Sequence, residues 1–222
     1  MKLFFSYLIN GIGLLLLGLF SLLMLDLILP YFSMNLNTDF LRTKLNVIHI
    51  KHWRWSFFVH IFTSLLVLIA GFTQFSRWIM RQRPGIHRRM GQLYVAVILI
   101  FSGPSGLIMY YYANGGRSSK ISFVILAGLW WIFTWLAYRT ALKKQWRKHG
   151  QFMVRSFALS LSAITLRVIM FILGPYQIDH VALYTWSAWL SWTINLAVAE
   201  GMIYAGYVDF LLKQPRKKQV LA

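Results

Sequence analysis

LFFSYLINGIGLLLLGLFSLLMLDLIL, from Leu3 to Leu29, is a long apolar run near the start of the chain. A bilayer core of about 30 Å requires roughly 20 apolar residues in a helix, so this run is long enough to cross it. A lysine precedes the run, as in a signal peptide, but the run is too long for one and lacks a small-residue cleavage site. We therefore predict a membrane anchor that is not cleaved.

Five further apolar runs follow. The six predicted spans cover residues 3–29, 53–80, 90–112, 121–142, 152–173 and 182–212. Of the whole chain, 58% is hydrophobic and 13% is charged, whereas soluble domains are about one quarter charged. We predict an all-α fold, a polytopic bundle of six transmembrane helices that forms a single membrane domain over residues 1–222. Pro104 should kink the third span, because proline interrupts the hydrogen bonds of a helix.

The net charge of +18 is carried by short basic runs between the apolar stretches, and not by one polar domain. With the N-terminus inside, 15 of the 23 Lys and Arg residues lie on the inner side and six on the outer side. The positive-inside rule then places both termini in the cytoplasm. The basic inner loops should attract anionic lipids, at about 1 kcal/mol per Lys or Arg, and no nucleic acid partner is expected.

The chain has no cysteine, which excludes disulfides, thiolate zinc sites and cysteine-ligated iron–sulfur clusters. Metal chemistry would therefore rest on histidines and acids. His87 and His149 lie at the inner ends of two predicted spans, and haem b between them would place Arg88 or Arg155 near a propionate. His60 lies within the second span, where no other histidine shares its depth. The alternative for each histidine is a hydrogen-bonded structural residue.

Two arginines lie inside predicted spans, where an unpaired charge costs at least about 2.5 to 3.5 kcal/mol. Arg155 lies about 9 Å above the inner end of its helix at 1.5 Å per residue, and Glu200 falls at a similar depth in the last span. We predict that these two side chains pair, in either a structural or a functional role. Arg167 belongs near the outer surface, where Asp179 and His180 are available or where its long side chain reaches the interface.

Four stretches together resemble the bacterial integral membrane family known as domain of unknown function 2306. They are VHIFTSLLVLIAGFTQF (Val59–Phe75), HRRMGQLYV (His87–Val95), HGQFMVRSFALSLSAITLR (His149–Arg167) and AWLSWTINLAVAE (Ala188–Glu200). The resemblance implies a multi-helix protein of the bacterial inner (plasma) membrane, and no activity comes with it. The matching positions are His60, Gln74, His87, Arg88, Gly91, Tyr94, His149, Met153, Arg155, Ser156, Thr165, Arg167, Trp192, Asn195 and Glu200.

The favoured function is a haem b electron carrier or a quinone-linked redox protein with a redox partner. Its polar inner site would consist of His87, His149, Arg155 and Glu200, with the two histidines as iron ligands and arginine balancing propionates or a semiquinone. The alternative is a non-enzymatic scaffold or assembly factor, or a small transporter, in which His60, Arg155 and Glu200 form a polar network. The residues do not decide whether the chain is an enzyme.

Overall fold

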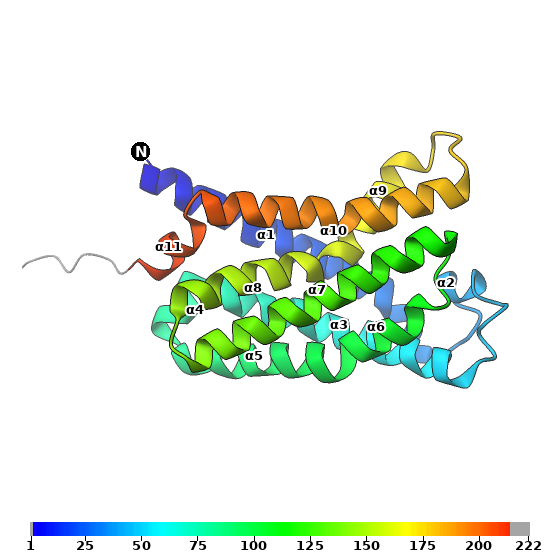
Figure 1. The fold of residues 1–222 in the computed structure, drawn as a ribbon, viewed down its shortest axis with the longest axis horizontal. Helices are drawn as coiled ribbons and strands as arrows, with labels where there is room; N and C mark the ends of the chain where they lie inside the picture. The colour runs from blue at the N-terminus through cyan, green and yellow to red at the C-terminus, as the bar shows by residue number, and fades with distance from the viewer. Residues whose placement is uncertain (1, 214–222) are drawn as a thin grey trace, which may run out of the picture.

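Long helices lying side by side make up the molecule (Figure 1). The structure, a computed structural model, describes residues 2–213, without the side chains of residues 2–10, 14, 16, 17 and 72. The longer helices are α1 (Lys2–Ile28), α3 (Lys51–Phe75), α5 (Pro84–Ala96), α7 (Gly116–Leu142), α8 (Trp146–Ser160), α9 (Ser162–Leu173) and α10 (His180–Tyr204). The shorter elements are η1 (Leu29–Ser33), α2 (Asp39–Arg42), α4 (Arg77–Gln82), the π-helix η2 (Val97–Ser102), α6 (Gly103–Tyr110) and α11 (Tyr207–Leu212). No strand occurs in the described residues, which confirms the predicted all-α fold.

Four helical segments are long and apolar enough to cross a membrane. They are Gly11–Ser33, Lys51–Phe75, Pro84–Tyr110 and Gly116–Leu142. The pair α8 and α9, bent by 40° at Leu161, is a fifth if it forms one span. With 25 residues α10 is long enough, but it is too polar to join this group and carries Asn195 and Glu200. The count of six spans and the side of each terminus therefore stay predictions.

Two predicted spans end earlier than their hydropathy implies. The second was expected to reach residue 80, but α3 ends at Phe75 because Ser76 is extended and its hydroxyl accepts a hydrogen bond from the Ile79 N–H at 3.3 Å, which starts α4. The last was expected to reach residue 212, but it breaks at Gly206, whose φ of 81° turns the chain into α11. A hydropathy window does not register such breaks, because apolar residues such as Trp78 to Met80 and Phe210 to Leu212 continue beyond them.

The third span changes helix type where its proline lies. The π-helix η2 joins α5 directly to α6, whose second residue is Pro104. Because proline has no N–H to donate, the predicted disturbance takes the form of a π-turn in the preceding residues. The backbone carbonyl of Ser102, at the end of this turn, lies 3.0 Å from Nδ1 of His60. Pro104, a local sequence signal, thus lies next to the turn whose carbonyl contacts His60 of α3.

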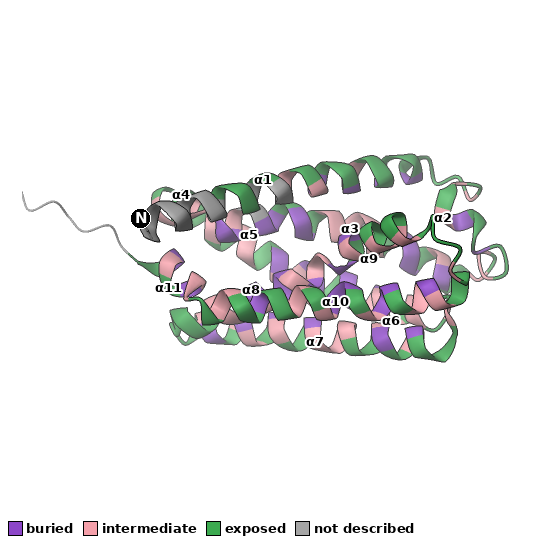
Figure 2. Cartoon of the chain, turned by 90° about the horizontal axis from the view of Figure 1, so that it is seen from above, coloured by how far each residue is buried: buried purple, intermediate pink, exposed green. Residues whose placement is uncertain are grey.

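The core lies where α8 packs against α7 and α10, and where α3 packs against α5, η2 and α6. Buried residues line these facing sides, while α1 lies at the edge and contacts mainly α3 (Figure 2). A glycine permits the approach of α3 to α8: a Cβ at Gly71 would lie 2.0 Å from Cε2 of Phe157. The largest fully buried side chains of the core around this contact are Tyr94, Ile98 and Val67.

Candidate functional site

His87 and His149 line one open-sided cavity of about 100 Å³, at the end of the bundle where α4 and α11 lie (Figure 1). Each histidine stands in the first turns of its helix, α5 or α8. A Cβ at Gly150 would lie 2.6 Å from Cγ1 of Val208, so this glycine lets α11 close over α8. The other lining residues are Gln74, Phe75, Met80, Trp146, Gly150, Met153, Val208, Leu211 and Leu212.

Both histidines are held by the same kind of hydrogen bond. Nδ1 of His87 lies 3.4 Å from the carbonyl oxygen of Thr73, and Nδ1 of His149 lies 2.9 Å from that of Ala137. A carbonyl only accepts, so Nδ1 carries the proton and Nε2 of the neutral ring has a free lone pair. Within residues 2–213 neither Nε2 has a hydrogen-bond partner. The cavity is therefore lined by two imidazoles whose tautomers are set from behind, as in metal-binding histidines.

Gln74 connects two walls of the cavity, α3, which carries the acceptor Thr73, and α5, which carries His87. Its Nε2 donates to Oγ1 of Thr73 at 2.8 Å and to the carbonyl of His87 at 3.2 Å. A Cβ at Gly91 would lie 3.0 Å from Oε1 of Gln74, so α5 approaches closely here. Sequence reasoning found Gln74 only through the family resemblance, and it missed the α11 wall, whose signal was Gly206.

The fit of haem b to this cavity is mixed. Two neutral imidazoles suit the iron, but cofactor and small-molecule sites have volumes of about 300–1,000 Å³, well above the volume here. The predicted propionate partners are also elsewhere: Arg88 is exposed, and neither Arg88 nor Arg155 lines the cavity. No group of three or more His, Asp or Glu residues that could hold a metal ion occurs in the described part of the chain. The cavity as it stands does not accommodate haem.

Arg155 and Glu200 form a second polar feature, separate from the histidines. Nε and Nη2 of Arg155 donate to Oε1 and Oε2 of Glu200 at 2.5 and 2.7 Å, a two-pronged pairing between α8 and α10. The guanidinium also lies 5.9 and 5.7 Å from the ring centres of Phe133 and Phe152. The arginine side chain is 19% exposed and the glutamate 48%. The structure thus divides the expected inner site into a histidine cavity and an ion pair nearer the helix surface.

The predicted contacts of Arg167 with Asp179 and His180 are not made, whereas the alternative, a side chain that reaches the interface, stays a prediction. Its Nη1 donates to the carbonyl of Ala163 one turn earlier at 3.0 Å, whereas Oδ2 of Asp179 accepts from the Ala182 N–H at 2.8 Å. Asp179 therefore caps the start of α10, because a carboxylate at that position satisfies a free N–H of the first turn. Neither Asp179 nor His180 contacts the guanidinium among the described residues.

Hydroxyl groups connect α5, α7 and α8 through the core. The buried Tyr94 hydroxyl lies 2.9 Å from Oγ of Ser156 and 3.0 Å from Oγ of Ser160. Oγ1 of Thr134 lies 2.7 Å from Oγ of Ser156, and Nε1 of Trp130 donates to Oγ of Ser160 at 3.0 Å. Hydrogen bonds between side chains in a low-dielectric interior reinforce one another, so this network fixes the three helices in register.

Asn195 ties α10 to the bend between α8 and α9. Its Oδ1 accepts from Oγ1 of Thr165 at 2.9 Å, and its Nδ2 donates to the carbonyl of Ala158 at 3.1 Å. Ala158 precedes the break at Leu161 and Thr165 follows it. Both sides of the bend are thus held by one side chain.

The positions of the recognised sequence pattern gather into these features. The histidine cavity is lined by Gln74, His87, His149 and Met153. Hydrogen-bonded pairs are formed by Arg155 with Glu200, Tyr94 with Ser156, and Thr165 with Asn195. A family model described as predicted membrane protein (DUF2306) matches residues 57–203. The chain belongs to this family.

The DUF2306 match covers both histidines and the ion pair, and it ends before α11. It agrees with the several apolar helices of the fold, and the chain is a multi-pass membrane protein. No curated protein and no solved structure matches the chain.

Proposed function

We propose that this DUF2306 protein is a quinone-linked redox protein, and that the cavity between His87 and His149 binds the head ring of a lipid quinol. The observation that supports this most is that two imidazoles, each held at Nδ1 by a backbone carbonyl, line one small cavity with mostly apolar walls. A quinol offers two hydroxyl hydrogens on opposite sides of a flat apolar ring. Each hydroxyl would donate to one Nε2.

The size of the cavity favours a single ring over a larger group. The volume of about 100 Å³ is smaller than the apolar cavity of about 150 Å³ that binds benzene, so a single ring would be partly enclosed and would extend through the open side. Phe75, Met80 and Met153 would contact the ring face, and thioethers pack well against aromatic rings. The isoprenoid tail would leave through the open side.

The two histidines would also take up the protons that leave the quinol. Oxidation of a quinol to the quinone releases two protons and two electrons, and a neutral imidazole exchanges protons near neutral pH. The electrons would pass to a separate redox protein. Arg155 and Glu200 have a structural role in this proposal, because neither lines the cavity.

Binding of a short-chain quinol to the purified protein in lipid nanodiscs tests the proposal. We expect His87→Ala and His149→Ala each to weaken binding by up to about tenfold, the value of one hydrogen bond of about 1.4 kcal/mol. The control is His180→Ala. His180 is exposed and is the first residue of α10, at the end of that helix away from α11, so the variant should bind the quinol as the wild type does. Equal binding by all four proteins would refute the quinol site.

Oxidised and reduced visible spectra of the same preparation separate quinol binding from haem binding. A stoichiometric b-type band that disappears in His149→Ala would show that the cavity widens to take haem, and the quinol proposal would then fail. A spectrum without such a band, together with histidine-dependent quinol binding, supports the proposal.

A further inference from the structure

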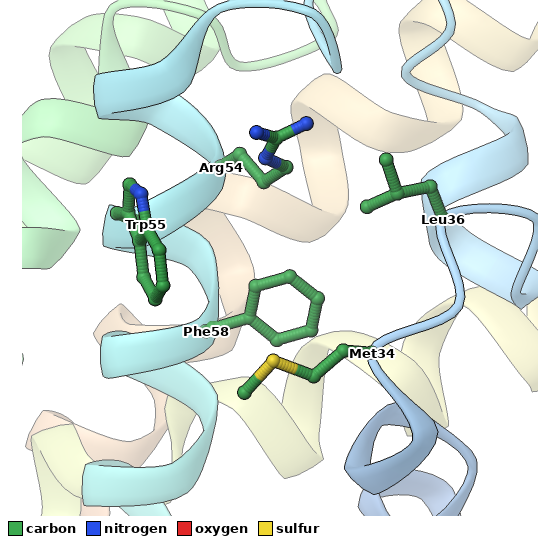
Figure 3. Close-up of a pocket in the computed structure, with 5 residues that line it drawn as sticks. All are labelled: Met34, Leu36, Arg54, Trp55 and Phe58. Atoms are coloured by element: carbon green, nitrogen blue, oxygen red, sulfur yellow. The ribbon is translucent and has the colours of Figure 1, made fainter.

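A second cavity lies at the opposite end of the bundle from the histidines, beside α2 (Figure 1). The segment after η1 and the first turns of α3 enclose a groove of about 170 Å³. Its lining residues are Met34, Leu36, Arg54, Trp55 and Phe58 (Figure 3). The groove is apolar apart from one guanidinium.

The guanidinium of Arg54 has no partner in the part of the chain that the structure describes. The side chain is partly buried and points toward the side of the groove that holds Leu36 (Figure 3), yet no hydrogen bond, ion pair or ring contact reaches it from the described residues. Both ion pairs in the described part of the chain, Arg147–Asp209 and Arg155–Glu200, involve other helices. A partly desolvated cation without a counter-ion is costly, so an anion that supplies the missing contacts would be bound favourably.

The apolar wall of the groove is held in place by an unusual backbone conformation. Met34 has a φ of 51°, which is uncommon for a residue with a side chain, and its N–H donates to the carbonyl of Tyr31 at 3.0 Å. Figure 3 shows the Met34 side chain extending beneath the ring of Phe58, with Leu36 across from Arg54. Phe58 is buried, whereas Met34 is 52% exposed, so the groove is open on the side of Met34.

The position of the groove places it at the membrane surface. Arg54 and Trp55 belong to the first two turns of α3, which is one of the helices able to cross a membrane. Trp55 is 60% exposed, and exposed tryptophans at the ends of spans favour the headgroup level. Lipid headgroups therefore lie within reach of Arg54, and acyl chains begin next to them.

We propose that this groove binds one anionic phospholipid, with the headgroup phosphate on Arg54 and the first part of an acyl chain against Met34, Leu36 and Phe58. Guanidinium suits a phosphate because its N–H groups form two parallel charge-assisted hydrogen bonds. The site lies at the other end of the bundle from the quinol cavity and does not depend on it. It also lies away from the basic loops where anionic lipids are expected.

Retention of phosphatidylglycerol, measured by native mass spectrometry after extraction from vesicles of phosphatidylcholine and phosphatidylglycerol, tests the site. We expect Arg54→Gln to lower the affinity for phosphatidylglycerol about tenfold or more, since two charge-assisted hydrogen bonds are lost. Arg54→Lys should fall between, because it keeps the charge but not the paired geometry. Lys51→Gln removes an exposed charge one turn earlier and should bind as the wild type does.

Two outcomes would overturn the proposal. The first is equal retention of phosphatidylglycerol by Arg54→Gln and the wild type, with thermal unfolding curves that show both proteins to be folded. This result would show that the groove does not hold the phosphate. Full displacement of phosphatidylglycerol by inorganic phosphate at equal concentration would show that the acyl contacts contribute nothing, and that the site takes phosphate and not a lipid. Weak competition by inorganic phosphate together with the loss in Arg54→Gln supports the lipid.

Discussion

Lys44 is buried although it belongs to a segment that connects two helices. Its side chain is 3% exposed, and Nζ donates to the carbonyl of Tyr112 and to Oδ1 of Asn114, both at 2.6 Å. Burial, together with the charge of Lys120, lowers the pKa of Lys44 from 10.5 to about 8. The neutral amine keeps two N–H donors, so both contacts survive deprotonation.

This lowered pKa predicts that the protein becomes more stable as the pH rises above about 8. Below the folded pKa, Lys44 is charged in both states and the cost of burying its charge is fully present. Between about 8 and 10.5 the unfolded chain binds more protons than the folded one, so the free energy of unfolding gains up to about 1.4 kcal/mol per pH unit from this group. Thermal unfolding at several pH values between 7 and 10 measures this rise in the free energy of unfolding.

Lys44→Met is the control for this prediction. The variant loses two hydrogen bonds and should be less stable at every pH, but its stability should lack the rise that Lys44 contributes. If the wild type and Lys44→Met show parallel pH dependence, other groups carry the effect and the assignment to Lys44 is wrong.

Arg155 and Arg167, the two arginines of the predicted fifth span, show what depth along a helix can and cannot predict. Arg155 and Glu200 were expected at similar depth, and the structure brings them into contact. The same reasoning placed Arg167 near the outer surface, within reach of Asp179 and His180 or of the interface, but the Asp179 carboxylate caps α10. Depth follows from residue counting, whereas the choice of partner depends on which backbone N–H groups also need an acceptor.

At the scale of elements, the contact between α3 and α8 depends on a residue without a side chain. Gly71→Ala would place a Cβ 2.0 Å from the present position of Phe157 Cε2, in a core that also contains Tyr94. Overpacking of this kind costs about 1–3 kcal/mol, because the ring or the helix must move. We expect a lower melting temperature for Gly71→Ala in thermal unfolding.

Gly128→Ala is a matched control in α7, because a Cβ there would meet nothing within 4 Å. Alanine is favoured over glycine within a helix by about 1 kcal/mol, so this variant should be unchanged or slightly more stable. Equal melting temperatures for the two variants would show that α3 and α8 separate without cost.

The histidine cavity arises from helix breaks more than from helix faces. Both histidines were expected at the inner ends of their spans, and both line one cavity. Its remaining wall comes from α11, which exists because Gly206 adopts a left-handed conformation. Because the residues on both sides of Gly206 are mostly apolar, hydropathy did not predict the break between α10 and α11. The sequence therefore predicted where the histidines lie in their helices, but not the α11 surface that encloses them.

At the scale of the whole molecule, α10 decides how many times the chain crosses the membrane. It runs back along the bundle antiparallel to the α8–α9 pair, and α11 follows it at the end where α7 meets α8 (Figure 1). We therefore expect residues after α10 to lie on the same side of the membrane as the α7–α8 turn. The hydropathy of α10 alone does not predict a crossing.

Labelling of single cysteines by a membrane-impermeant reagent measures this topology, and the chain has no native cysteine to interfere. Lys143→Cys and Lys213→Cys should react from one side, and Tyr176→Cys, between α9 and α10, from the other. Reaction of Lys213→Cys from the same side as Tyr176→Cys would show that α10 does not cross, and the prediction of six spans would be wrong.

The sequence by itself determined that this is a helical membrane protein and where most of its long helices lie, and it predicts at what depth the charged residues stand in them. These properties are local: hydropathy acts residue by residue, and the helical rise converts position into depth. Only the tertiary structure decided that Lys44 is buried, that the histidines share a cavity from which Arg155 and Glu200 are absent, and that the Arg54 guanidinium meets no partner among the described residues. Each of these depends on contacts between residues far apart in the chain, and such contacts are set by how the helices pack and by which polar groups compete for the same acceptors.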